Sequence, residues 1–334
     1  MRRWHVVLFG AAFLLLLAAT FIHPGAVISA QPAGKAKVQA AQPPGKAGRT
    51  QAVQPGGSAP KQAAQTMPVA AAANRPGPPG AGSRSFPPDP TMLRLIVQRL
   101  LFAAAGTRVQ GKIGGLVSPS HGYLSSGIVA AAGYKQLPAS IKTVFILGPS
   151  QQPNFSGAAI PASQSYRTPL GEVPLSAIAG KLSRQPGFTP ASRSQIHEQS
   201  IEIQLPFLQQ TLKKFELVPV LVGKSDPLKL AQQIIPFLTD DSLIIASSNL
   251  SEQSPYDKAA SLDQRTARAI TSFDFKTVAS SEASGRTSIA VLMEIARQKK
   301  WSAQLIDYEN SGNTTRARKQ VAGFASIAFV GGKK

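Results

Sequence analysis

From residue 91 onward, short apolar runs alternate with segments in which apolar residues recur every three or four positions. Short runs are typical of buried strands, and the wider spacing is typical of helices with one buried face. We therefore expect strands at residues 113–117, 144–147, 217–222, 243–246, 303–308 and 325–330. We expect helices at residues 92–102, 126–136, 175–184, 200–212, 228–238, 257–273 and 288–299.

This alternation predicts the fold class: a single α/β domain over residues 91–334, with a mostly parallel or mixed sheet and helices on both faces. Ligand sites of such sheets lie beyond the carboxyl ends of the strands. Polar residues follow three of the predicted strands at that end: Ser-Pro-Ser-His from Ser118, Gly-Pro-Ser-Gln from Gly148 and Ser-Ser-Asn from Ser247.

Residues 1–30 have the pattern of a signal peptide. Arg2 and Arg3 precede an uncharged run at residues 6–22, and small residues follow at 26–30. A basic start, an apolar middle and a small-residue end favour export and cleavage after Ala30. The run is slightly shorter than the roughly 20 residues that a membrane-spanning helix needs, and an uncleaved anchor is the alternative. We therefore expect an exported protein that is periplasmic, extracellular or membrane-tethered.

Residues 31–90 differ in composition from residues 91–334. They hold 12 of the 27 prolines, and Ala, Gln and Gly make up most of the remainder. Such a segment cannot bury enough apolar surface to offset the entropy lost on ordering. We predict a disordered linker, which is basic because its seven Lys and Arg residues face Asp89 alone.

The net charge of +20 is spread over linker and domain. A surface of this kind favours contact with anionic envelope polymers or a membrane surface, although no particular partner is indicated. Nucleic acid is disfavoured, because the linker has a single aromatic residue, Phe86, on which a base could stack. The absence of cysteine excludes thiolate nucleophiles and thiolate metal ligands.

The segments after the strands carry a resemblance to a known family. The relevant stretches are Ser118-Pro-Ser-His-Gly-Tyr-Leu-Ser-Ser-Gly, Phe145-Ile-Leu-Gly-Pro-Ser-Gln, Glu198-Gln-Ser-Ile-Glu-Ile-Gln-Leu-Pro-Phe, Ala246-Ser-Ser-Asn-Leu-Ser-Glu and Ser284-Gly-Arg-Thr-Ser-Ile. In order and spacing they resemble motifs of the Memo family, whose bacterial branch is called AmmeMemoRadiSam system protein B. The resemblance implies a fold shared with class III extradiol dioxygenases and a metal pocket.

The resemblance also implies that this chain has lost the metal ligands. Where the family places His, His, His, Asp, His and Cys, this sequence has Ser120, Gln151, Gln199, Asn249, Glu252 and Ser284. Among the six, only Glu252 is a good ligand for a divalent metal. Each imidazole or thiolate of a zinc site supplies on the order of 3 kcal/mol, so losing two weakens binding by roughly four powers of ten. We therefore expect no metal, no cofactor and a vestigial pocket.

Two rebuilt sites are conceivable in this pocket. His121, His197 and Glu252 could form a two-His, one-carboxylate metal site, but a one-residue shift on extended chain reverses a side chain's direction. Ser120 beside His121 could suggest a hydrolase, but adjacent residues on extended chain point apart and no Gly-x-Ser-x-Gly elbow occurs. Neither rebuilt site is favoured.

The resemblance adds Tyr123, Glu202 and Arg286 to the vestigial pocket. Ile201, Leu205 and Leu208 have the spacing of a buried helical face, which would leave Gln199 and Glu202 together on another face. Whether Glu202 pairs with Arg286 stays open at this point.

Three functions remain. The favoured one is a non-catalytic binding or scaffold module in the cell envelope, because the replaced residues cannot hold a metal. The alternative is an enzyme with a rebuilt pocket, which could be metal-dependent and related to the extradiol dioxygenases, because polar residues persist at the strand ends. The third is a basic protein whose main role is electrostatic contact with polymers or membrane.

Overall fold

The computed structural model describes residues 86–152, 154–161, 163–191 and 198–331. All of them belong to one compact unit, Val69–Lys334. The predicted signal peptide and nearly all of the predicted linker lie outside the described residues, so both stay predictions. No helix in the described part of the chain is long and apolar enough to cross a membrane.

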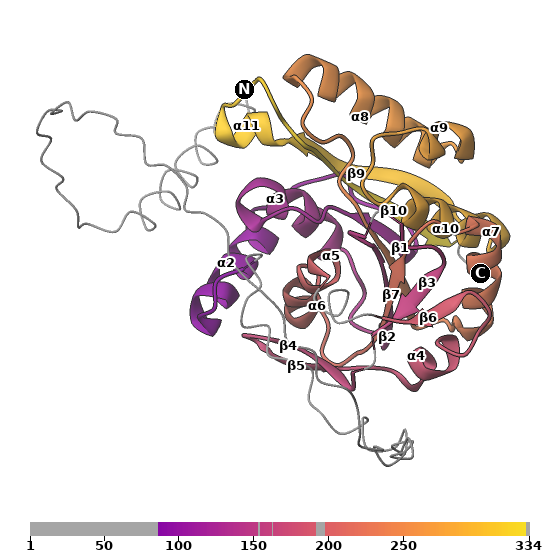
Figure 1. The fold of residues 1–334 in the computed structure, drawn as a ribbon. Helices are drawn as coiled ribbons and strands as arrows, with labels where there is room; N and C mark the ends of the chain where they lie inside the picture. The colour runs from indigo at the N-terminus through magenta and orange to yellow at the C-terminus, as the bar shows by residue number, and fades with distance from the viewer. Residues whose placement is uncertain (1–85, 153, 162, 192–197, 332–334) are drawn as a thin grey trace, which may run out of the picture. The chain divides into compact units, whose positions relative to one another are not determined.

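An eight-stranded sheet forms the centre of this unit, in the order β6-β3-β7-β2-β8-β1-β10-β9 (Figure 1). The four central strands, β7, β2, β8 and β1, are all parallel to one another. Antiparallel pairs join β3 to β7 on one side and β10 to β1 and β9 on the other. The strands are β1 (Lys112–Ser118), β2 (Thr143–Pro149), β3 (Ala158–Ile160), β6 (Phe188–Pro190), β7 (Glu216–Val222), β8 (Ser242–Ser247), β9 (Ser302–Asn310) and β10 (Gly323–Gly331).

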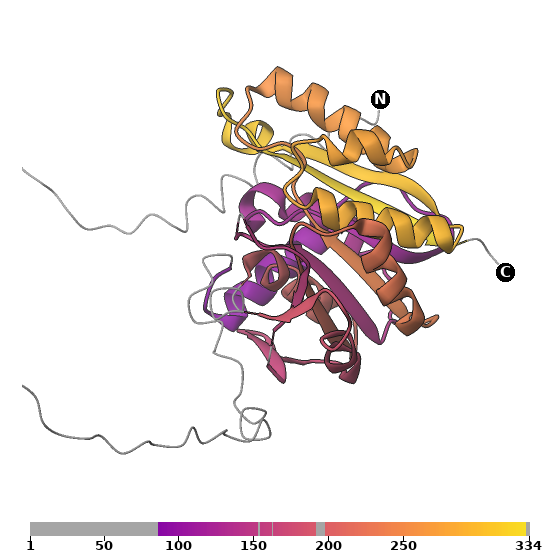
Figure 2. The same cartoon turned by 45° about the vertical axis from the view of Figure 1, so that its right-hand side comes forward.

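Side chains of the central strands alternate between two buried faces. Val117, Phe145 and Ile244 belong to one core cluster, together with residues from α4 (Ala177–Leu182), α7 (Pro227–Ile234), α8 (Tyr256–Thr271), α9 (Phe275–Ala279) and α10 (Arg286–Gln298). On the other face lie α3 (Tyr123–Tyr134), α5 (Gln199–Glu202) and α6 (Leu205–Thr211), with α2 (Pro90–Ala103) outside them (Figure 2). The structure therefore confirms the predicted fold class: a largely parallel mixed sheet covered by helices on both faces.

All six predicted strands are present, and each is extended by a few residues at most. The predicted helix at residues 200–212 is wrong in one respect, because the structure divides it into α5 and α6. Pro206 lies at the start of α6 and has no N–H to continue the bonding pattern of α5, so the helix restarts there. The sequence pattern did not predict β3, β6, α9, α11 (Ser311–Thr315) or the hairpin of β4 (Ser165–Thr168) and β5 (Gly171–Pro174).

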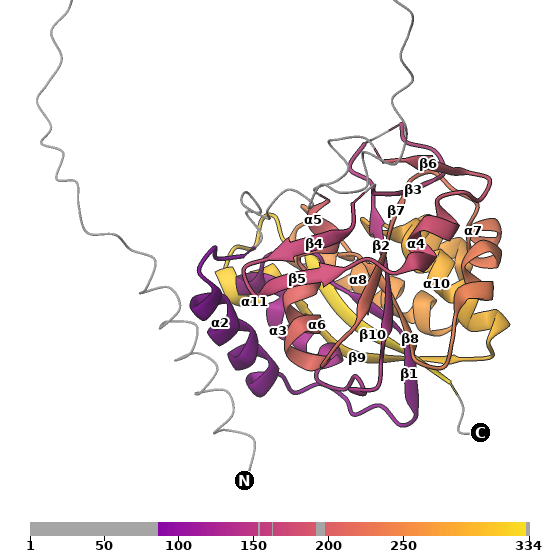
Figure 3. The same cartoon turned by 90° about the horizontal axis from the view of Figure 1, so that it is seen from below.

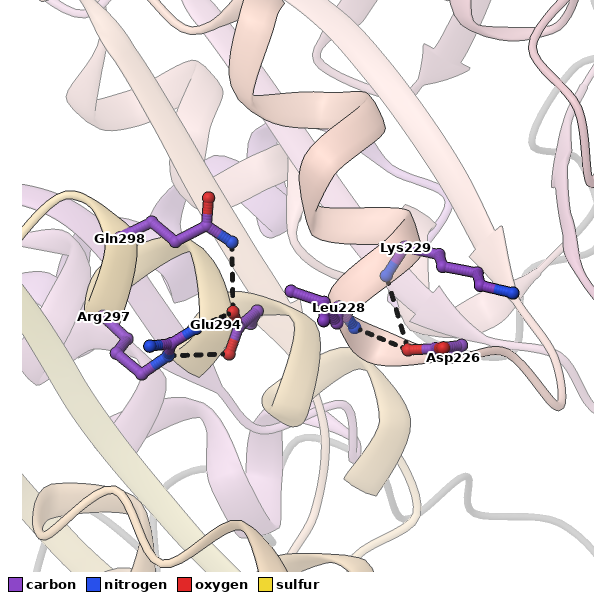
Figure 4. A network of polar contacts seen from close by, with 6 residues as sticks. All are labelled: Asp226, Leu228, Lys229, Glu294, Arg297 and Gln298. Atoms are coloured by element: carbon purple, nitrogen blue, oxygen red, sulfur yellow. Dashed lines mark hydrogen bonds and ion pairs between the residues drawn. The ribbon is translucent and has the colours of Figure 1, made fainter.

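Two of the helices opposite α3 are held at their ends by local polar contacts. The carboxylate of Asp226 caps α7 by accepting hydrogen bonds from the backbone N–H groups of Leu228 and Lys229 (Figure 4). On α10, Glu294 accepts hydrogen bonds from Arg297 and Gln298. These contacts hold the ends of α7 and α10, which pack on each other.

Candidate ligand-binding cleft

A polar cleft of about 460 Å³ lies beyond the carboxyl ends of β1, β2 and β8. The parallel register places these three ends side by side, because Ser118 lies opposite Ser247 and Leu147 opposite Ala246. The loops that follow the strands, together with the first turn of α5, form the walls. The lining residues are Ser120, His121, Gly122, Pro149, Ser150, Gln151, Gln199, Ser200, Asn249, Glu252 and Ser284.

The cleft brings together most of the residues that the sequence singled out. Ser120, His121, Gln151, Gln199, Asn249, Glu252 and Ser284 all line it, although they come from segments up to 164 positions apart (284 − 120). Three predicted members, Tyr123, Glu202 and Arg286, are not among its lining residues. His197 lies outside the described residues.

Asn249 is the centre of the hydrogen bonding on one wall. Its Oδ1 accepts a hydrogen bond from the backbone N–H of Ser120 at 3.1 Å, and its Nδ2 donates to Oε1 of Glu252 at 3.1 Å. Its own backbone N–H donates to Oγ of Ser284 at 3.0 Å. Three of the six positions that correspond to family ligands are therefore bonded directly to Asn249, and its amide is committed to protein partners.

Glu198 is a buried carboxylate behind the cleft that belongs to one of the family motifs but was not singled out from the sequence. Its side chain is 4% exposed and accepts hydrogen bonds from the backbone N–H of Gln151 and from Oγ of Ser200. Burial raises the pKa of Glu198, and the hydrogen bonds from Ser200 and Gln151 act against that rise. The sequence could have indicated Glu198 by its position, because it comes immediately before the first turn of α5, and that turn lines the cleft.

His121 contributes the imidazole of the cleft. Its Nδ1 lies 2.7 Å from Oγ of Ser125, and its ring packs against Phe324 with ring centroids 5.5 Å apart. Partial burial lowers the pKa of His121, and the nearby charge of Glu252 acts in the opposite direction. The imidazole is therefore favoured in its neutral form at physiological pH.

A buried amide network beneath the cleft ties the strand ends to α5. The side chain of Gln204 is 1% exposed, and its Oε1 accepts hydrogen bonds from the hydroxyls of Ser118 and Tyr134. Its Nε2 donates to the carbonyl of Pro119 and to Oγ of Ser247. Gln204 thus links the ends of β1 and β8 to the turn between α5 and α6, and it was not among the residues singled out from the sequence.

Gln199 and Glu202 both lie on α5 but differ in exposure. Ile201, Leu205 and Leu208 are buried as expected, but Glu202 is buried too, whereas Gln199 is exposed in the cleft. The break between α5 and α6 removes the single continuous face that the spacing assumed. Among the ion pairs of the described residues, none joins Glu202 to Arg286, which is exposed at the start of α10. Tyr123 is buried as well, and its hydroxyl donates to the carbonyl of Ile203.

The residues of the cleft do not fit the metal that the resemblance implies. Its donors are serine hydroxyls, side-chain amides, one imidazole and one exposed carboxylate, and hydroxyls and amides bind first-row metals weakly. The carboxylate of Glu252 already accepts a hydrogen bond from the Asn249 amide, which places an N–H where a metal would need a lone pair. Within the described residues, no three His, Asp or Glu side chains are grouped so that they could hold a metal ion.

Comparison with known proteins agrees with the motif resemblance. A family model described as Memo-like protein matches residues 78–328. A MEMO1 family protein of Archaeoglobus fulgidus is 31% identical over 266 residues, which cover 75% of this chain and 98% of that protein. A MEMO1 family protein of Methanopyrus kandleri is 30% identical over 278 residues, with the same shares covered.

Proposed function

Because the chain belongs to the Memo family, we propose that it is a non-catalytic member whose cleft binds a small polar ligand without a metal, as a module of the cell envelope. The proposal of export rests on the signal-like pattern of residues 1–30, and contact with the envelope rests on the charge of +20. The cleft supplies the chemistry of binding.

The observation that carries the proposal is the hydrogen bond from Nδ2 of Asn249 to Oε1 of Glu252. In a metal site both residues would direct lone pairs at one point. Here an amide N–H points at the carboxylate, and the amide oxygen is bonded to the backbone of Ser120. The wall is therefore held together by hydrogen bonds between its own groups, and the carboxylate of Glu252 keeps its charge.

The remaining cleft groups define the class of ligand. Ser120, Ser150, Ser284, Gln151 and Gln199 offer hydroxyls and amides that both donate and accept hydrogen bonds. Glu252 is the only formally charged side chain among the described lining residues. Such a cleft suits a small ligand that carries hydroxyl groups and an amine, since the amine would contact Glu252 and the hydroxyls would bond to the serines and amides.

The experiment is metal loading of the purified full chain. After anaerobic incubation with ferrous iron, and separately with zinc, the protein should leave a desalting column with far less than one metal per chain. The matched control restores the family residues in one variant: Ser120→His, Gln151→His, Gln199→His, Asn249→Asp, Glu252→His and Ser284→Cys. This variant should gain metal, because each restored ligand contributes on the order of 3 kcal/mol.

Stoichiometric metal on the unmodified chain would overturn the proposal. If His121→Ala or Glu252→Ala then removed that metal, the second candidate would replace it, namely an enzyme with a rebuilt site around His121. That candidate rests on a neutral imidazole lining the cleft near Glu252. Its weakness is that the hydrogen bond of His121 goes to Ser125, which does not line the cleft.

A further inference from the structure

The helix α2 has more apolar surface than the domain buries. Its inner side, with Leu93, Ile96, Val97 and Leu100, is buried where the helix packs on α3 and α6. On its outer side Met92 is 41% exposed, Leu95 is 42% exposed and Phe102 is 91% exposed. A phenylalanine that is almost fully exposed leaves most of its apolar surface in water, so its position calls for an explanation.

The exposed apolar residues of α2 form one stripe. At about 100° per residue, Met92, Leu95 and Phe102 fall within an arc of roughly 80°. Arg99 lies within the same arc, and Arg94 lies further around the helix. Figure 3 shows α2 along the outside of the α3 and α6 pair, and the exposure of Met92, Leu95 and Phe102 places the stripe on the solvent side of the helix.

The helix carries two cations, Arg94 and Arg99, and residues 90–171 hold seven Lys and Arg residues and no acid. Two of the seven pair with acids, Lys142 with Asp241 and Arg167 with Glu172, and Asp89 caps the start of α2. Nζ of Lys135 donates to the carbonyl of Ala104 at 2.5 Å, which fixes an ammonium group at the C-terminal end of α2. Lys135 and Arg108 also line a hollow there of about 500 Å³.

We propose that the outer face of α2, defined by Met92, Leu95, Arg99 and Phe102, docks on an anionic lipid surface. Apolar side chains with flanking cations are the pattern of helices that lie in the membrane interface, where the side chains enter the acyl boundary and the cations contact phosphates. A soluble anionic polymer would satisfy the cations but would leave Phe102 in water. The cations therefore favour an anionic partner. The exposed apolar stripe favours a lipid surface over a soluble polymer.

The test is co-sedimentation of the full chain with vesicles of phosphatidylcholine alone or with 30 mol% phosphatidylglycerol. We expect binding only to the anionic vesicles. Leu95→Ser with Phe102→Ser should weaken it by about tenfold or more, because each buried apolar side chain contributes over 1 kcal/mol. Arg94→Gln with Arg99→Gln should weaken it by about fivefold per charge, from roughly 1 kcal/mol for each cation near the surface.

The matched control is Leu228→Ser. Leu228 is 43% exposed on α7, which lies on the opposite face of the sheet, and its backbone bond to Asp226 does not involve the side chain (Figure 4). This variant should bind vesicles as the unmodified chain does. A second readout is the fluorescence of Phe102→Trp, which should shift to the blue on anionic vesicles, whereas that of Leu228→Trp should not.

Two results would overturn the proposal. Unchanged vesicle binding in the Leu95→Ser, Phe102→Ser variant, with no blue shift at position 102, would mean that the basic N-terminal segment alone contacts the lipid. Concentration-dependent dimers in sedimentation equilibrium that this variant abolishes would mean that a second copy of the chain covers the stripe. Because all the substituted side chains are exposed, matching thermal unfolding curves will show that the variants are folded.

Discussion

The cleft and the outer face of α2 are two exposed surfaces of the same domain with opposite chemistry. In and behind the cleft, polar groups are bonded to one another: the side chain of Asn249 to Glu252, its backbone N–H to Ser284, and Glu198 to Ser200. On α2 the exposed apolar side chains of Leu95 and Phe102 have no apolar cover from the core, and the charged residues within the helix are Arg94 and Arg99. The charged lining of the cleft is negative although the chain carries +20.

This difference shows that the charge of one local surface can be opposite in sign to the net charge of the whole chain. The cations lie on helices and loops at the surface, where water solvates them at little cost. The cleft lies at the strand ends, where the backbone and the buried amide of Gln204 dictate which side chains can be satisfied. An anionic surface and a hydroxylated amine can therefore bind the same domain at separate places without competing, provided that both proposals hold.

The largest expected effect comes from a substitution that removes the buried hydrogen bonds beneath the cleft. Gln204→Leu removes the partner of two hydroxyls, of the Pro119 carbonyl and of Ser247, all of which lie in a region without access to water. We expect the free energy of unfolding to fall by about 3–5 kcal/mol, since each buried unsatisfied group costs about 1–3 kcal/mol. Urea unfolding measures this loss.

The matched control for that change is Gln199→Leu, five positions earlier. Gln199 is exposed in the cleft, so its replacement should change the free energy of unfolding by less than about 0.5 kcal/mol. Equal losses in the two variants would contradict the view that Gln204 holds the strand ends together.

Much of the fold follows from the sequence because the four central strands are almost fully buried. Runs such as residues 217–222 and 243–246 have no polar interruption, so their length and composition indicate a parallel core strand. The short strands β3 and β6, of three residues each, carry no such pattern; β3 pairs with β7, and β6 pairs with β3 at the edge of the sheet.

The membership of the cleft was predictable in part for the same reason. Ser120, Gln151 and Asn249 follow buried parallel strands, whose carboxyl ends must meet at one edge of the sheet. Glu202 was grouped with Gln199 on helical spacing alone, and spacing does not show what packs against each side chain. Gln204 was missed because a buried glutamine resembles any polar helical residue until its partners from distant strands are known.

A second, smaller effect would sharpen the contrast in charge between the two surfaces. We expect thermal shifts of the full chain to rank an amino sugar above a neutral sugar, and a neutral sugar above a uronic acid, because Glu252 attracts the amine and repels the carboxylate. Glu252→Gln should remove this ranking, with affinity for the amino sugar falling about two- to fivefold, as expected for an exposed ion pair. Arg99→Gln on α2 is the control and should leave the ranking intact; a ranking that survives Glu252→Gln would place the amine elsewhere.

The smallest effect concerns the pH dependence of stability and tests whether Glu198 is as buried as the structure has it. Burial raises the pKa of Glu198 above its ordinary value, so the folded chain keeps this proton to a higher pH than the unfolded chain does. The contribution of the group to the free energy of unfolding is therefore fully present below the unfolded pKa of about 4.3 and is lost as pH rises through the raised folded pKa. In Glu198→Gln this loss is absent. In urea unfolding between about pH 4 and 7, the stability of the variant should therefore rise relative to that of the unmodified chain as pH rises.

Asp274→Asn is the control of opposite sign: hydrogen bonds from Thr277 lower the pKa of this exposed helix-capping carboxylate, so its contribution is lost as pH falls. If Glu198→Gln and the unmodified chain kept the same difference in stability at every pH, Glu198 would be ionised and solvated, and the carboxylate behind the cleft would be open to water.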